Sequence, residues 1–153
     1  MGSFVENIDS FLTSIYPRLN NDGVCILSFY NIGALRYVTP PPWRDSTLSA
    51  ELVRNRHELE VTLPSGEQFN IFCKAYEDSA LKEICERYFD NVEILSSSAL
   101  ASFLPSQFFS SGNAAAKAKE VIKAFDIELE KSGVMHGAYF TVICRAPKHA
   151  PAE

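Results

Sequence analysis

Long apolar runs, clustered metal ligands and an excess of positive charge are all absent from this sequence of 153 residues. No apolar run approaches the roughly 20 residues that a membrane-spanning helix needs, so we expect no membrane association. The chain has 14 Lys and Arg against 19 Asp and Glu, a formal net charge of −5. Because such a chain offers no broad cationic surface to a phosphate backbone, nucleic acid is not an expected ligand.

The four cysteines and three histidines are too widely spaced to predict a metal or redox centre. No Cys-x-x-Cys pair occurs, and each cysteine lies among apolar neighbours, as reduced core residues do. The first residues contain no basic stretch followed by an apolar signal core. We therefore expect a cytoplasmic protein with no bound metal.

What the sequence does contain is the composition of one globular domain, with 46% hydrophobic and 22% charged residues. Apolar residues at three- and four-residue intervals predict a helix over residues 4–19, and Pro17 should distort its last turn. Residues 24–30 form an almost unbroken apolar run of strand length. This run predicts a strand buried on both faces of a layered α/β sheet.

The middle of the chain has one irregular stretch and one clear hairpin. Residues 31–57 form a long connection in which residues 47–55 are a possible short helix, and connections of this length are often functional. Residues 58–63 and 68–72 each alternate in polarity on either side of turn residues. This pattern predicts a β-hairpin.

The last third of the chain alternates between helix and strand patterns. Helices are predicted over residues 77–89 and 113–131, and strands over residues 92–95 and 138–144. Residues 96–112, between them, predict a packed loop.

Three passages of the sequence carry a family resemblance. Residues 11–31 run through a helix and a glycine turn into a strand that ends near an Asn. Phe89–Ile94 matches the wording "Phe, x, Val, Val, Glu", and Gly137–Pro147 matches "Gly, x, Tyr, Phe, x, Val, x, x, Arg, Lys, Pro". Together these passages resemble the C-terminal half of a class I S-adenosylmethionine-dependent methyltransferase.

The resemblance implies an α/β fold with a partial Rossmann-like methyltransferase sheet. Its strands would be equivalent to strands 5, 6 and 7 of the family, the last antiparallel, with flanking helices and an inserted β-hairpin. Residues 1–147 would form a single half-domain of this kind, with the loop and hairpin 31–73 inserted and residues 148–153 as a flexible tail.

The cofactor-binding part of that family is not recognisable in the chain. The family uses a glycine-rich turn after its first strand, whereas the closest pair among the seven glycines here, Gly133 and Gly137, lies four positions apart. The resemblance therefore implies that S-adenosylmethionine is bound mainly by a partner and not by this chain alone. That partner would be a cofactor-binding methyltransferase half or a second copy of the chain, and the chain alone should be inactive.

The predicted sheet is also incomplete on physical grounds, independently of the family. The strand at residues 24–30 has only the strands near Val92 and Val142 as neighbours, so one of its edges would keep unpaired backbone groups. In the family, the fourth strand occupies this edge.

Tyr30 and Asn31 are the first candidate substrate-binding residues. They follow the buried strand, and open α/β sheets bind ligands at the carboxyl ends of their strands. The alternative is that these polar residues cap the loop that follows.

Arg36, Tyr37 and Trp43 combine charge and aromatic surface in the long connection, a mixture suited to substrate recognition. Alternatively, the aromatic rings cover the core and Arg36 pairs with a nearby carboxylate. His57 is a residue type suited to general-base catalysis, but no acidic partner is implied, and a surface histidine is the alternative. His136 is interpreted as a loop residue, and the serines at 96–98 lack the Gly-x-Ser-x-Gly pattern of a hydrolase nucleophile.

Two main hypotheses of function follow. The first is a subunit or fragment of an S-adenosylmethionine-dependent methyltransferase that supplies the side facing a small-molecule methyl acceptor. The alternative is a non-catalytic binding or scaffold module with a methyltransferase-like fold. A third is a free-standing small enzyme that uses Tyr30, His57 or Arg36.

Overall fold

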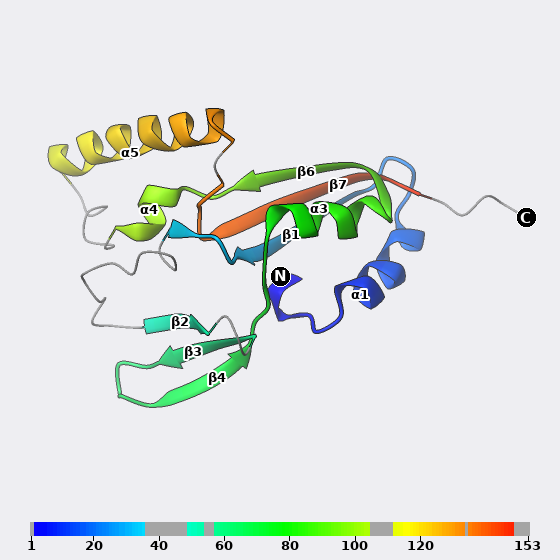
Figure 1. The fold of residues 1–153 in the computed structure, drawn as a ribbon, viewed down its shortest axis with the longest axis horizontal. Helices are drawn as coiled ribbons and strands as arrows, with labels where there is room; N and C mark the ends of the chain where they lie inside the picture. The colour runs from blue at the N-terminus through cyan, green and yellow to red at the C-terminus, as the bar shows by residue number, and fades with distance from the viewer. Residues whose placement is uncertain (1, 36–48, 54–56, 105–111, 134, 149–153) are drawn as a thin grey trace, which may run out of the picture.

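The computed structural model describes residues 2–35, 49–53, 57–104, 112–133 and 135–148. These residues form a mixed α/β structure with a four-stranded mixed sheet, a three-stranded antiparallel sheet and helices (Figure 1). Among them, no helix combines the length and the apolar character required to cross a membrane. The predicted tail lies outside the described residues from residue 149 onward.

The four-stranded sheet has the order β5-β1-β7-β6. Its strands are β1 (Val24–Asn31), β5 (Ala75–Tyr76), β6 (Phe89–Ser96) and β7 (Tyr139–Pro147). β7 lies between β1 and β6 and runs antiparallel to both, while the short β5 pairs in parallel with the end of β1. The three longer strands were predicted, and β5 was not.

The first helix is shorter than predicted. α1 spans Ile8–Ile15 because Asn7 caps it, its side chain accepting a hydrogen bond from the Ser10 amide at 3.0 Å. Tyr16–Arg18 then form a 3₁₀ turn that contains Pro17, so the predicted distortion is confirmed. Residues 2–4 form a separate 3₁₀ turn, η1.

α1 and α3 (Asp78–Glu86) pack on the same face of the four-stranded sheet. The Asp9 carboxylate joins the two helical segments, accepting hydrogen bonds from Arg87 at 3.0 Å and from the Tyr88 hydroxyl at 3.1 Å. The main core lies between these helices and the sheet. Its largest fully buried side chains include Leu12, Phe29, Leu81, Phe89, Phe140 and Val142.

The prediction that the first strand is buried on both faces is wrong. Leu27 and Phe29 point into the core, whereas Val24 and Ile26, on the opposite face of β1, are 47% and 65% exposed. The reason is that α1 and α3 both pack on one face. Leu95, on β6, also belongs to the opposite face, which we call the open face.

The three-stranded sheet consists of β2 (Ser49–Val53), β3 (Glu58–Thr62) and β4 (Gln68–Phe72). The predicted hairpin is confirmed by the β3–β4 pairing. Over residues 49–53 the short helix expected within 47–55 is instead strand β2, since pairing with β3 overrides a weak local pattern.

The four cysteines are buried and free, as predicted. Cys85 and Cys144 hydrogen-bond to each other within the core. This bond, together with burial, raises the pKa of the Cys144 thiol.

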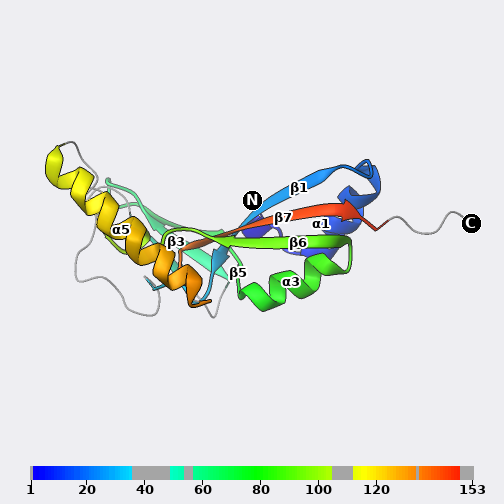
Figure 2. The ribbon, with the colours of Figure 1, turned by 90° about the horizontal axis from the view of Figure 1, so that it is seen from above.

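α4 (Ala99–Phe103) lies beyond the carboxyl end of β6 (Figure 1), as does α5 (Asn113–Lys131), which Figure 2 shows from above. The helix at 113–131 was predicted, but α4 falls in a stretch that was expected to be a loop. The apolar side chains of α5 are only partly covered, because Ile122 is buried whereas Val121 is 66% exposed and Phe125 46% exposed.

Candidate functional site

Two adjoining cavities lie at the end of the main sheet where the parallel strands β1, β5 and β6 all finish. The first, here called the β1 cavity, has a volume of about 370 Å³ and is bordered by the end of β1, the start of α3 and the segment before β7. The second, the α5 cavity, has a volume of about 390 Å³ and lies between α5 and the β6–α4 segment. Met135 and His136 border both. Carboxyl ends of parallel strands are the usual ligand sites of α/β sheets.

Asn31 ties together the two chain segments around the β1 cavity. Its side chain is 2% exposed, and its amide nitrogen donates to the carbonyl oxygens of Met135 and Gly137, both at 2.8 Å. Its amide oxygen accepts from the Gly33 backbone N–H, also at 2.8 Å. The Asn31 amide is thus used within the protein, and its role is to position the loops that form the cavity.

His136 presents one ring nitrogen for chemistry. Its Nδ1 lies 2.9 Å from the Gly33 carbonyl oxygen, and its backbone carbonyl accepts from the Leu35 N–H at 2.9 Å. Because a carbonyl oxygen only accepts, Nδ1 carries the proton, which leaves Nε2 as an acceptor when the imidazole is neutral. An exposed histidine held in this tautomer can accept a proton from a bound molecule.

Two carboxylates complete the β1 cavity. Glu77 and Asp78 border it at the start of α3, and both residues are exposed. Across the described ranges, no group of three or more His, Cys, Asp or Glu side chains is arranged to hold a metal ion. The β1 cavity therefore combines a proton acceptor with local negative charge.

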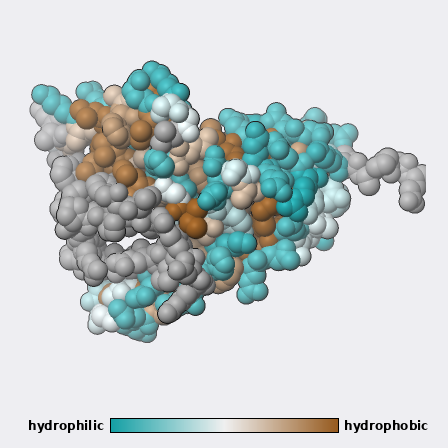
Figure 3. Space-filling view, in the orientation of Figure 1, coloured by the Kyte–Doolittle hydropathy of each residue, from teal (hydrophilic) through white to brown (hydrophobic). Residues whose placement is uncertain are grey.

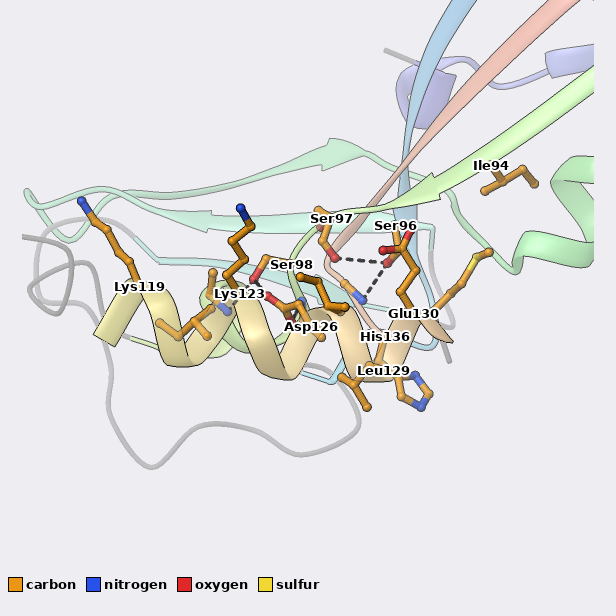
Figure 4. Close-up of a pocket in the computed structure, with 16 residues that line it drawn as sticks. Ile94, Ser96, Ser97, Ser98, Lys119, Lys123, Asp126, Leu129, Glu130 and His136 are labelled. Atoms are coloured by element: carbon orange, nitrogen blue, oxygen red, sulfur yellow. Dashed lines mark hydrogen bonds between the residues drawn. The ribbon is translucent and has the colours of Figure 1, made fainter. Parts of the chain in front are cut away.

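Three consecutive serines form a wall of the α5 cavity (Figure 4). The Ser96 hydroxyl accepts from the Gly137 N–H at 3.0 Å and donates to the Ser97 carbonyl at 3.2 Å. The Ser97 hydroxyl accepts from the Tyr139 N–H at 3.0 Å. Gly137 has no room for a side chain, since a Cβ there would lie 1.8 Å from the Ser97 oxygen. These contacts join the carboxyl end of β6 to the start of β7.

Asp126 connects the same wall to α5. Its carboxylate accepts from the Ser98 hydroxyl and from the backbone N–H groups of Ala99 and Leu100, at 3.0 and 3.2 Å. The Ser98 hydroxyl in turn accepts from the Ala101 N–H at 2.9 Å. Asp126 thereby caps α4, and its negative charge is compensated inside the protein.

Comparison with known families and with curated proteins finds no match for this chain. Any role for these residues therefore rests on geometry and chemistry.

The predicted site residues are not gathered in one place. Asn31 borders the β1 cavity, but Tyr30 points to the opposite face of β1, where its ring lies 6.1 Å from that of Phe4 and 4.8 Å from that of Tyr139. His57 is exposed at the start of β3 and borders neither cavity. Arg36, Tyr37 and Trp43 lie outside the described residues.

The contribution of His136, Glu77 and Asp78 to the β1 cavity was not predicted from the sequence. Glu77 is the N-cap residue of α3 and Asp78 lies in its first turn, positions at which acidic residues are common in any helix. His136 meets Gly33, a residue 103 positions away, so no local pattern could have joined them.

Proposed function

We propose that this chain is the acceptor-binding side of an S-adenosylmethionine-dependent methyltransferase, completed by a unit that binds the cofactor. The observation that carries the proposal is the outer edge of β1, along which the described chain supplies almost no partner strand. The complementing unit would be a separate chain, a second copy, or another part of a longer polypeptide.

The direction of the backbone groups defines this edge. The Asn31 N–H donates to the Ala138 carbonyl on the β7 side at 3.0 Å, whereas the Tyr30 N–H donates to the Ser3 hydroxyl on the other side at 2.7 Å. Because successive residues of a strand direct their N–H and C=O groups to opposite sides, Val24, Ile26 and Ser28 direct theirs away from β7.

β5 pairs only with Tyr30 and Asn31, so no strand of the described chain pairs with the outer edge between Val24 and Phe29. Unpaired edges of this kind accept an added strand. A parallel strand there would correspond to the fourth strand of the family that the sequence resembles.

The open face supports the same proposal. Layered α/β sheets bury both faces, and here Val24 and Ile26 on β1 and Leu95 on β6 remain exposed opposite α1 and α3. A unit that adds a strand beside β1 would also be placed to cover these side chains. Their burial would stabilise the complex by about 25 cal/mol for each Å² of apolar surface removed from water.

The residues of this chain do not by themselves fit the cofactor. Of the seven glycines, no two are close enough to form the glycine-rich turn that admits a dinucleotide-like ligand. When bound to the complementing unit, S-adenosylmethionine would supply an electrophilic methyl group. The role of this chain would then be to hold a small-molecule methyl acceptor beside β1.

Calorimetry tests the proposal. S-adenosylmethionine is titrated into the chain alone and into the chain mixed with the product of a neighbouring or upstream coding sequence that contains a glycine-rich turn. We expect heat of binding only in the mixture. Binding by the lone chain would contradict the proposal, and a mixture that forms no complex would favour the scaffold alternative.

A matched pair of variants tests whether the complementing unit binds beside β1. Ile26→Glu places a charge on the open face beside the outer edge of β1 and should weaken the complex at least about tenfold. Val121→Glu places the same charge at an equally exposed position on α5 and should leave the affinity unchanged. Equal effects of the two substitutions would argue against complementation at β1.

A further inference from the structure

The α5 cavity has the properties of a ligand site that lies wholly within this chain. Its volume of about 390 Å³ falls within the range of small-molecule pockets, about 300–1,000 Å³. We propose that it binds a small organic monoanion with an apolar body, and that Lys119 and Lys123 hold the anionic group. The proposal goes beyond the proposed function and does not require a complementing unit.

The interior of the cavity favours an apolar body. Aliphatic side chains form much of its lining: Ile94, Ala99, Ile122, Ile127, Leu129 and Met135. The polar atoms of the wall are already bonded, since the hydroxyls of Ser96, Ser97 and Ser98 all bond to protein groups. A ligand body therefore needs no hydrogen bonds to this serine wall, and a polar group placed against the wall would be desolvated without compensation.

The charges around the cavity favour an anionic group. Lys119 and Lys123 lie one helical turn apart on α5, and Figure 4 shows both extending to the side on which the serines lie. Neither lysine side chain has a hydrogen bond or ion pair within the described chain.

The acidic residues of the lining leave these lysines available. Asp126 is occupied by the start of α4, and Glu130 forms no ion pair with either lysine. Within the described chain, two unpaired lysine side chains and one unpaired carboxylate therefore border the cavity, so a carboxylate ligand would gain charge-assisted bonds.

The surface of α5 is also partly apolar. Figure 3 shows hydrophobic residues gathered over α4 and α5, where Val121, Phe125 and Ile127 on α5 are exposed. Ile127 itself borders the cavity.

NMR titration of the lone, ¹⁵N-labelled chain tests the proposal with three probes: 2-naphthoate, octanoate and the uncharged 2-naphthalenemethanol. We expect saturable shifts of the amides around the α5 cavity with a carboxylate, and binding at least about tenfold weaker for the alcohol. The two carboxylates distinguish an aromatic from an aliphatic body. Equal affinity for alcohol and acid, or no saturable shift up to about 10 mM of either acid, would overturn the proposal.

Variants test the two lysines and the apolar interior of the cavity separately. Replacing both exposed lysines, Lys119→Gln with Lys123→Gln, should lower the affinity for 2-naphthoate about tenfold. Lys117→Gln, on the same helix but outside the cavity lining, should leave that affinity unchanged. Ala101→Leu fills part of the cavity and should weaken both acids. Unchanged affinity in the double lysine variant would contradict the assigned role of these residues. The NMR titrations use the lone chain without cofactor or partner, so their failure would leave the methyltransferase proposal standing. Failure of the calorimetric test would likewise leave the ligand site at the α5 cavity standing.

Discussion

Asn31 is the side chain on which the carboxyl end of β1 depends. It is buried, donates two hydrogen bonds to the segment before β7 and accepts one from the segment after β1. All of these bonds need the amide, since the two carbonyl oxygens require a donor and the Gly33 N–H requires an acceptor. His136 depends on the same arrangement because its Nδ1 bonds to the Gly33 carbonyl.

Asn31→Asp should therefore destabilise the protein. A carboxylate cannot donate to the carbonyl oxygens of Met135 and Gly137, and a buried unpaired charge is costly. We expect the free energy of unfolding in urea to fall by about 2–4 kcal/mol. Asn91→Asp, at an exposed position on β6, is the control and should change it by less than about 0.5 kcal/mol. Similar losses in both variants would contradict the role given to Asn31.

Among the elements, the inner strand β1 is paired unequally along its two edges. Its inner edge pairs with β7 over seven residue pairs, whereas its outer edge pairs with β5 only at Tyr30 and Asn31. The same strand is buried on one face and exposed on the other. The backbone groups on the outer edge of β1 would find hydrogen-bond partners if another strand were added beside it.

Hydrogen exchange should reveal this asymmetry residue by residue. In the lone chain, the amides of Ile26 and Ser28 should exchange at least about 100-fold faster than those of Leu27 and Phe29, which face β7. NMR measures each amide separately. Uniform protection along β1 would show that the outer edge is paired, and the basis of the complementation proposal would be lost.

At the scale of the whole molecule, a second apolar cluster joins the two sheets. Leu59 and Val61 of β3 and Cys73 are buried together, and Phe4 and Tyr30 pack against them. Cys73 follows β4 and precedes β5, so it lies where the chain passes from one sheet to the other. Burial raises the pKa of its thiol from 9.0 to about 11.

This shift predicts a loss of stability in alkali. The folded state holds the Cys73 proton more tightly than the unfolded state, so the contribution is fully present below pH 9 and is lost as the pH rises through 11. Between these values, the stability advantage of the natural protein over Cys73→Ser should shrink by about 1–3 kcal/mol in urea unfolding under reducing conditions. Parallel stability curves for the two proteins would show that Cys73 does not ionise on unfolding.

Much of the secondary structure could be predicted because it depends on neighbours a few positions apart. The apolar run became β1, the alternating segments became the β3–β4 hairpin, and Pro17 ended the regular helix. The failures involve distant partners. The segment that forms β2 was predicted to be a short helix, and it is a strand because it pairs with β3. β5 is too short to have a sequence pattern of its own.

The sequence by itself determined which segments become helices and strands, since periodicity and turn chemistry act within a few residues. Only the tertiary structure decided that α1 and α3 share one face and leave the other open, and that Asn31, Gly33 and His136 meet at one cavity. Those outcomes depend on contacts between residues up to about 100 positions apart, and local patterns carry no information about which distant segments will pack together.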